Sequence, residues 1–222
     1  MSARENILAR IRAAQGRNGP PDAHERAVVA AHLGAHPGGP RPQQAADAVA
    51  GFKSWALKLS TTVAEVAGMA GVPLAIAKYL EQNQLPKTAV CWPEFFELEW
   101  QAAGIKIESR AAEGSDLVGI TGAFCAIAET GTLLTLSGPR TPATTSLLPE
   151  THIAVVRASR LVRSMEDAWE LLRAEQGVNF MPRAANFISG PSRTADIEQT
   201  LVLGAHGPYR VHIVLVGDSA AS

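Results

Sequence analysis

One glutamate stands between two strongly apolar segments, where a carboxylate is costly unless it is hydrogen-bonded or faces a cleft. Glu129 separates the segment AFCAIA from the segment TLLTLS. In one interpretation its carboxylate is a catalytic nucleophile or base, or a ligand contact, with Thr130 beside it. In the other it is a turn carboxylate that accepts hydrogen bonds from the backbone N–H groups of Gly131 and Thr132. The residues alone leave both interpretations open.

A second group of polar side chains follows a strand-like approach in the stretch FISGPSRTADIE (187–198). Gly190 and the proline after it end the strand, and Ser192 or Thr194 is of the type that caps a helix, which we expect to run to about Leu203. The polar members of the stretch are Ser192, Arg193, Thr194, Asp196 and Glu198.

A helix N-terminus attracts anions, but the charges of this stretch restrict which anion fits. Asp196 and Glu198 would fall in the first turn and repel a bare phosphate, and Arg193 offsets them only in part. The stretch therefore favours a ligand that carries a carboxylate or a hydroxyl group. Helix capping without any ligand is the alternative.

The third candidate is the loop GAHGP (204–208), in which two glycines flank a histidine. Gly204 and Gly207 indicate an unusual backbone path, and His206 between them is expected to be exposed. A turn histidine is often only solvated, so this loop indicates a ligand site only in combination with Glu129 and the 187–198 stretch.

Composition excludes several classes of function. With 20 Lys+Arg against 21 Asp+Glu, the net charge of -1 gives no reason to expect nucleic acid or an anionic membrane as partner. No apolar run approaches a membrane span, and no secretory signal is recognisable, so we expect a cytoplasmic protein. Cys91 and Cys125 are too few for an iron–sulfur cluster on this chain. No phosphate-binding loop, dinucleotide fingerprint, nucleophile elbow or zinc signature is present, and we expect no metal site.

The elements that must position these residues alternate in type from residue 47 onward. Strands alternating with helices of about ten residues predict a parallel sheet covered on both faces, an α/β domain of three layers. Before it, residues 3–15 predict an amphipathic helix whose apolar stripe covers the main body or a partner chain, and 16–46 a Pro/Gly-rich linker with one helical turn at 24–33. We thus divide the chain into 1–46 and 47–222. The expected helices are 47–59, 73–83, 94–103 and 164–173, and the expected strands are 61–66, 88–92, 105–108, 132–136, 152–157, 185–189 and 211–216.

Three motifs together carry a family resemblance: AIAETGTLLTLSGP (126–139), SLLPETHIAVV (146–156) and ISGPSRTADIEQTLVLGAHGPYRVHIVLV (188–216). The chain resembles the LUD-domain family, and within it the lactate utilization proteins of the C type. The resemblance covers roughly residues 47 to 217 and the N-terminal helix. It implies a NagB/RpiA/CoA-transferase-like fold and a part in the oxidation of L-lactate to pyruvate beside iron–sulfur partner proteins, which would hold the redox centres.

A more distant similarity concerns Glu129. Some CoA transferases use the glutamate of a Glu-Asn-Gly turn as nucleophile, and Glu129-Thr130-Gly131 is similar to it except that Thr replaces Asn. In such a fold the turn would lie at the carboxyl ends of parallel strands, where α/β sheets bind ligands. We therefore expect the three motifs to converge on one pocket for a small carboxylate. Its residues would be Glu129, Thr130, Gly131, Thr132, Gly190, Ser192, Arg193, Thr194, Asp196, His206 and Gly207.

Three functions compete on this evidence. The first is a non-redox component of a lactate-utilization system that binds a small ligand. The second is a separate CoA-transferase-like or sugar-phosphate isomerase-like enzyme that uses Glu129. The third is a structural assembly subunit that docks through its N-terminal helix, on partner proteins or on copies of itself.

Overall fold

The computed structural model describes residues 2–16, 19–41, 45–177, 180–194 and 202–218. Contacts within the chain separate two compact units, Met1–Arg41 and Pro42–Ser222. Across the described residues, no helix has the length and apolar character needed to cross a membrane.

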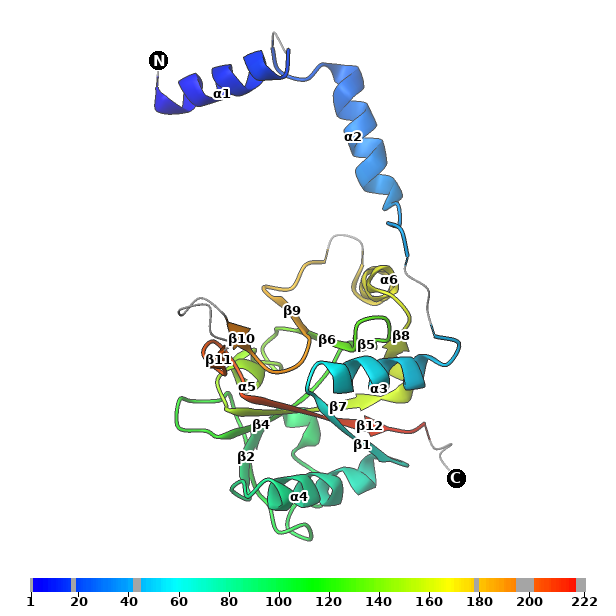
Figure 1. The fold of residues 1–222 in the computed structure, drawn as a ribbon, viewed down its shortest axis with the longest axis vertical. Helices are drawn as coiled ribbons and strands as arrows, with labels where there is room; N and C mark the ends of the chain where they lie inside the picture. The colour runs from blue at the N-terminus through cyan, green and yellow to red at the C-terminus, as the bar shows by residue number, and fades with distance from the viewer. Residues whose placement is uncertain (1, 17–18, 42–44, 178–179, 195–201, 219–222) are drawn as a thin grey trace. The chain divides into compact units, whose positions relative to one another are not determined.

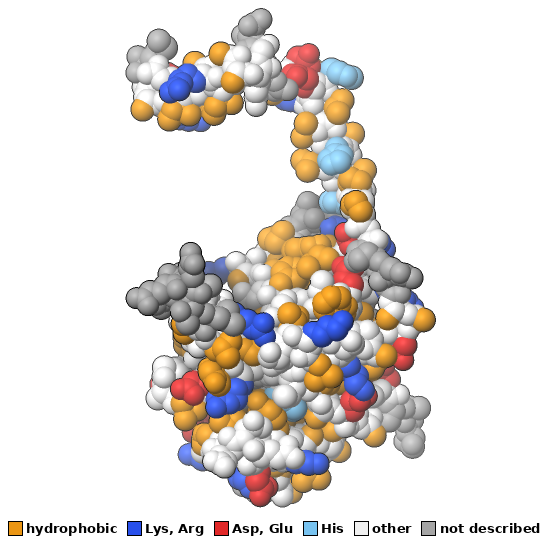
Figure 2. All heavy atoms as spheres, viewed as in Figure 1, with side chains coloured by type: hydrophobic (Ala, Val, Ile, Leu, Met, Phe, Trp, Pro, Cys, Tyr) orange, Lys and Arg blue, Asp and Glu red, His pale blue; other side chains and the backbone are white. Residues whose placement is uncertain are grey.

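The first unit consists of two helices, α1 (Ala3–Ala14) and α2 (Ala23–Ala35). Each begins with reciprocal capping hydrogen bonds, between Ser2 and Glu5 in α1 and between Asp22 and Glu25 in α2. No described residue of either helix is buried, and Figure 2 shows apolar side chains along both. The prediction of a linker with one helical turn at 24–33 was wrong, because Asp22 and Glu25 form a capping pair and a full helix follows it.

The second unit is built around a parallel sheet of six strands in the order β1-β12-β7-β4-β2-β3 (Figure 1). A second sheet has the order β8-β5-β6-β9, and β10 and β11 form a separate antiparallel pair. The strands of the six-stranded sheet are β1 (Thr62–Val66), β2 (Thr88–Cys91), β3 (Lys106–Ser109), β4 (Val118–Gly122), β7 (Thr151–Arg157) and β12 (Arg210–Val216). The remaining strands are β5 (Cys125–Ile127), β6 (Thr132–Leu136), β8 (Leu161–Val162), β9 (Ala185–Ile188), β10 (Arg193–Thr194) and β11 (Val202–Leu203).

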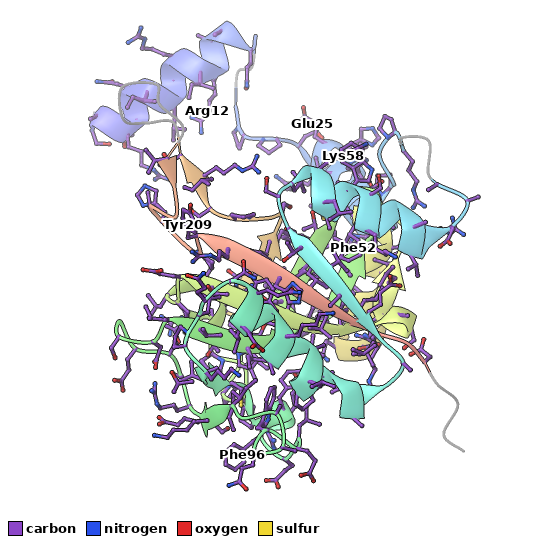
Figure 3. The ribbon with its side chains drawn as sticks, turned by 60° about the horizontal axis from the view of Figure 1, so that its bottom comes forward. Arg12, Glu25, Phe52, Lys58, Phe96 and Tyr209 are labelled. Carbon is purple, nitrogen blue, oxygen red and sulfur yellow. The ribbon has the colours of Figure 1, made fainter. Side chains whose placement is uncertain are left out.

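The parallel sheet is covered on both faces, which confirms the predicted α/β architecture. The helices of this unit are α3 (Ala48–Lys58), α4 (Val72–Gln82), α5 (Thr144–Leu147) and α6 (Met165–Gln176). Helix α4 packs on one face, while α3 and the second sheet cover the other (Figure 1). Phe52 of α3, which is fully buried, points into the core that α3 shares with both sheets (Figure 3). Helix α6 packs on the outer side of the second sheet.

The helix predicted over 94–103 is absent. The chain instead makes a 3₁₀ turn at Pro93–Phe95 and continues through further turns. The indole N–H of Trp100 donates a hydrogen bond of 2.7 Å to the Phe95 carbonyl oxygen, and both aromatic side chains are buried. The backbone N–H groups of Leu98 and Ala103 donate to the carbonyl oxygens of Phe95 and Trp100, three residues back, as in 3₁₀ turns.

The prediction of a helix from Ser192 or Thr194 to about Leu203 is also wrong for the described residues at each end of that segment. Arg193–Thr194 and Val202–Leu203 are paired as antiparallel strands, and 195–201 lie outside the described residues. Ser192 is engaged on both sides, since its N–H donates to the Pro208 carbonyl and its own carbonyl accepts from Gly204 N. These two bonds hold the segment in a hairpin and leave no helix start for Ser192 to cap.

Candidate functional site

The predicted site residues are organised around the C-terminal end of α3. The guanidinium of Arg193 donates from Nη2 to the Leu59 carbonyl oxygen at 3.0 Å and to Ser60 Oγ at 2.6 Å. Its side chain is exposed, and no carboxylate among the described residues pairs with it. The helix end thus holds the guanidinium at Nη2, and its other two nitrogens have no partner among the described residues.

Two glycines of the motifs approach α3 so closely that a side chain could not be accommodated. A β-carbon at Gly131 would lie 2.5 Å from the backbone nitrogen of Ala56, and one at Gly190 would overlap the carbonyl oxygen of Leu59. Both have positive φ, 63° and 80°, which favours glycine. The ETG turn and the GPSR segment therefore pack against successive parts of the same helix.

A direct side-chain contact also joins these two motifs. Thr132 Oγ1 and Ser189 Oγ are 2.7 Å apart, within hydrogen-bonding distance, although the residues are 57 positions apart in sequence. Thr132 is buried at the start of β6 and Ser189 directly follows β9, the neighbouring antiparallel strand. Sheet pairing brings the hydroxyl groups together.

The GAHG loop lies beside the GPSR segment. Besides the two backbone bonds of Ser192, a β-carbon placed on Gly207 would be 3.3 Å from Ser192 Cβ. His206 is exposed, as its glycine-flanked position predicts. Tyr209 marks the start of β12 next to this loop (Figure 3), and its Cβ lies 3.1 Å from the position of a β-carbon on Gly204.

Glu129 is engaged by a different element. Its Oε1 accepts a hydrogen bond of 2.8 Å from the backbone nitrogen of Met165, the first residue of α6, and not from Gly131 or Thr132. Its Oε2 is buried and has no hydrogen-bond partner in the described structure. The turn that holds Glu129 joins antiparallel strands β5 and β6 of the second sheet, so it does not lie at the carboxyl edge of the six-stranded sheet.

The structure thus brings most of the predicted residues together around α3 and places Glu129 apart from them. Around the end of α3 lie Gly131, Thr132, Gly190, Ser192, Arg193 and Gly207, with His206 exposed on the adjoining loop. Glu129 is directed to α6. Thr130 is exposed, Thr194 is buried in the β10–β11 pair, and Asp196 lies outside the described residues.

Sequence reasoning missed a cavity of about 300 Å³ at the carboxyl edge of the six-stranded sheet. Its charged lining residues are Glu94, Arg157 and Arg160. A signal for the first two was present, because each lies within three residues of the end of a parallel strand, where α/β sheets bind ligands. The remaining lining residues are Met69, Phe95, Gly122, Ala123 and Val155.

Known proteins resemble this chain over the region that holds the predicted site residues and the cavity. The chain matches the LUD domain family over residues 41–216. Lactate utilization protein C of Exiguobacterium sp. is 45% identical over 120 residues, which cover 54% of this chain and 52% of that protein. The Bacillus subtilis protein of that name is 39% identical over 122 residues, 54% of this chain and 50% of the relative. In these two comparisons the chain spans about half the length of the relative.

A longer match to another relative and a solved structure also resemble this chain. Lactate utilization protein C of Anoxybacillus flavithermus is 31% identical over 153 residues, 69% of this chain and 67% of that protein. The crystal structure of a DUF162 family protein from Deinococcus radiodurans has the same fold, with a TM-score of 0.57 and 24% identity, covering 79% of this chain and 100% of that one. Since the family match extends over both sheets and every motif considered above, the chain belongs to the LUD domain family.

Proposed function

We propose that the chain is a cytoplasmic, non-redox component of an L-lactate utilization system, which works beside iron–sulfur partner proteins and binds a small carboxylate around the end of α3. The names of its relatives support the lactate role. The finding that carries the ligand site is Arg193, an exposed guanidinium held at Nη2 by Leu59 and Ser60 and bordered by the other motifs. A guanidinium fixed in this way offers its free edge to a carboxylate.

The two cysteines support a role without thiol redox chemistry. Both are buried, and burial raises the pKa of the Cys91 thiol to about 12 and that of Cys125 to about 11. A thiolate is the form that reacts and binds metals, and burial disfavours it strongly at both positions. Electron transfer would then belong to the partner proteins.

The proposal is tested by thermal unfolding of the full chain with L-lactate, pyruvate, coenzyme A esters and sugar phosphates. Pyruvate, which lacks a hydroxyl group, should raise the midpoint of the wild type and fail to raise that of Arg193→Gln. Arg10→Gln, an exposed arginine of α1, is the matched control and should respond like the wild type. Stabilisation by pyruvate that survives Arg193→Gln would refute the site, and stabilisation by none of these compounds would refute ligand binding of this kind.

A second candidate is a CoA-transferase-like or isomerase-like enzyme that uses Glu129. The observation in its favour is the Oε2 atom, which has no partner within the described residues. Turnover of an acyl-CoA or a sugar phosphate by the isolated chain, lost in Glu129→Gln without a loss of stability, would support the enzyme over the first proposal.

A structural assembly role is a third candidate, favoured by the apolar side chains that α1 and α2 expose. Ile7, Ile11, Val28, Val29 and Leu33 are each 47–64% exposed. Deletion of residues 1–41 should then abolish co-purification with iron–sulfur partners, or self-association, and leave the fold of the second unit intact. Retention of both associations in the deleted chain would rule out this role for the helices.

A further inference from the structure

The cavity at the carboxyl edge of the six-stranded sheet is built from several strand ends. Residues after β1, β2, β4 and β7 line it, and the parallel pairing of β2, β4 and β7 places three of these ends side by side. The carboxyl edge is where loops are free to carry functional groups, while the sheet fixes their positions. At about 300 Å³, the cavity is at the lower end of the range for small-molecule sites.

Glu94 provides the cavity with a carboxylate placed over the end of β4. A β-carbon at Gly122 would overlap Glu94 Oε1 and would lie 3.4 Å from the ring of Phe95, so the glycine leaves the space that the carboxylate occupies. Desolvation raises the pKa of Glu94, although part of the side chain remains open to solvent, while the positive charges of Arg140 and Arg157 act in the opposite direction. No described residue donates a hydrogen bond to this carboxylate.

Arg157 provides the cavity with an uncommitted cation. It is the last residue of β7, its side chain is exposed, and it forms no hydrogen bond or close ion pair within the described part of the chain. Arg160 differs, because its Nε donates to the Phe124 carbonyl oxygen at 2.7 Å and its two terminal nitrogens bind the carboxylate of Glu175. Arg160 is therefore a neutralised, fixed part of the wall, and Arg157 is the cation left for a ligand.

A tight turn brings a second cation near Glu94. Gly138 and Thr141 exchange backbone hydrogen bonds of 3.2 and 3.1 Å, which closes the turn that carries Arg140. The indole N–H of Trp92, at the end of β2, donates to the Pro142 carbonyl oxygen at 3.2 Å and ties this loop to the sheet edge. Around the cavity the positive charge of Arg140 and Arg157 thus exceeds the single charge of Glu94, which favours an anionic ligand.

We propose that this cavity binds a small hydroxycarboxylate, with the ligand carboxylate on Arg157 and the ligand hydroxyl donating to Glu94. Arg157 presents the planar fork that matches a carboxylate. A bare carboxylate would leave Glu94 without a donor and facing a like charge, whereas a hydroxyl group provides that donor. The apolar side chains of Met69, Phe95 and Val155 suit the carbon skeleton of such a ligand.

This site is separate from the one around α3, and the two share no residue. Lactate is a hydroxycarboxylate, so in this respect the inference rests on the proposed function and names a second place for the same class of ligand. Separate variants distinguish the two, because Arg157 and Arg193 belong to different sites.

The test is isothermal titration of the full chain with L-lactate, glycolate and propionate, the last lacking the hydroxyl group. The wild type should bind the two hydroxy acids at least tenfold more tightly than propionate. In the Arg193→Gln background, which removes the site around α3, a further Arg157→Gln change should weaken hydroxy-acid binding at least tenfold. A further Glu94→Gln change in that background should reduce the preference for a hydroxyl group. Arg157→Lys, which keeps the charge, should retain part of the affinity if Arg157→Gln folds poorly.

Matched controls are Glu97→Gln and Arg10→Gln, both exposed and outside the cavity, and both should bind like the wild type. Arg193→Gln should also leave this binding unchanged. The inference is overturned if affinity survives both cavity variants, if Arg193→Gln abolishes it, or if the wild type binds no hydroxy acid or does not distinguish it from propionate.

Discussion

Glu129 and Met165 are joined by a hydrogen bond of 2.8 Å from the Met165 backbone nitrogen to Glu129 Oε1, which links the β5–β6 turn to the first turn of α6. A carboxylate at this place satisfies a free N–H group and faces the positive end of the helix dipole. Because the carboxylate adds to the cap that Ser164 already provides, it has a structural role whatever its chemistry.

The first prediction concerns this link. Glu129→Ala should lower the free energy of unfolding by about 1–2 kcal/mol, as expected for loss of a helix cap. Glu129→Gln keeps an acceptor oxygen and should lose less. Urea denaturation of both variants measures the difference, and an alanine variant as stable as the wild type would show that the bond contributes nothing.

The second prediction concerns acid stability. His152 Nε2 lies 2.8 Å from Thr121 Oγ1, and His212, which stacks on Tyr79, is 2.8 Å from Thr62 Oγ1. Burial lowers the pKa of each imidazole from 6.5 to about 4. Between these values the unfolded chain binds protons that the folded chain excludes. The contribution of the neutral imidazoles to the free energy of unfolding should be fully present above pH 6.5. It should fall toward pH 4 by about 1.4 kcal/mol per pH unit for each histidine.

Urea titrations between pH 7.5 and 4.5 measure this slope. His152→Gln retains a polar group near Thr121 but cannot be protonated, so its slope should be shallower than that of the wild type. Equal slopes in the two proteins would contradict the assignment to His152.

The third prediction concerns the glycines that face α3. Gly131→Ala should be destabilised by positive φ, about 1–2 kcal/mol, and by overlap with Ala56, roughly 1–3 kcal/mol more. Gly104→Ala has a similar φ of 70° but open space, so it should show only the first effect. Gly114→Ala has neither and should be neutral. Thermal unfolding should rank the three in this order, and equal losses at Gly131 and Gly104 would show that α3 yields to the added methyl group.

The fourth prediction concerns the core between the two sheets. Phe52 is fully buried, whereas Trp55 of the same helix is 44% exposed. Phe52→Ala should cost about 3–5 kcal/mol, and Trp55→Ala distinctly less, because truncation of a buried ring leaves a cavity. Chemical denaturation of the two variants compares them. A larger loss at Trp55 would place the main packing of α3 on its other side.

The strands could be predicted largely because their composition is local information. Runs such as Thr132–Leu136 and residues 153–156 of β7 are continuously apolar or β-branched, as expected for buried strands. The segment 94–103 could not be predicted, because its helix-like pattern is overridden by the burial of Phe95 and Trp100. The hairpin at Arg193–Thr194 depends on contacts with Pro208 and Gly204, which no pattern within the segment reveals.

The candidate sites, like the fold, could be predicted from the sequence only in part. The residue types around α3 were identifiable, but the partners of Arg193 are 134 and 133 positions away in sequence, so they follow only from the topology. Glu94 and Arg157 were missed for a similar reason. Each lies near a strand end but outside the polar motifs, and their shared cavity depends on the neighbouring positions of β2, β4 and β7 in the sheet.

The position of β12 has a consequence for how the protein folds during synthesis. Strand β1 is made early, yet its only neighbour in the described sheet is β12, which is made after every other described strand. While the ribosome is still translating the segments between them, β1 has no partner, and one edge of β7 is unpaired. The six-stranded sheet can therefore close only after β12 has been made, and the nascent chain must keep two strand edges from aggregating until then.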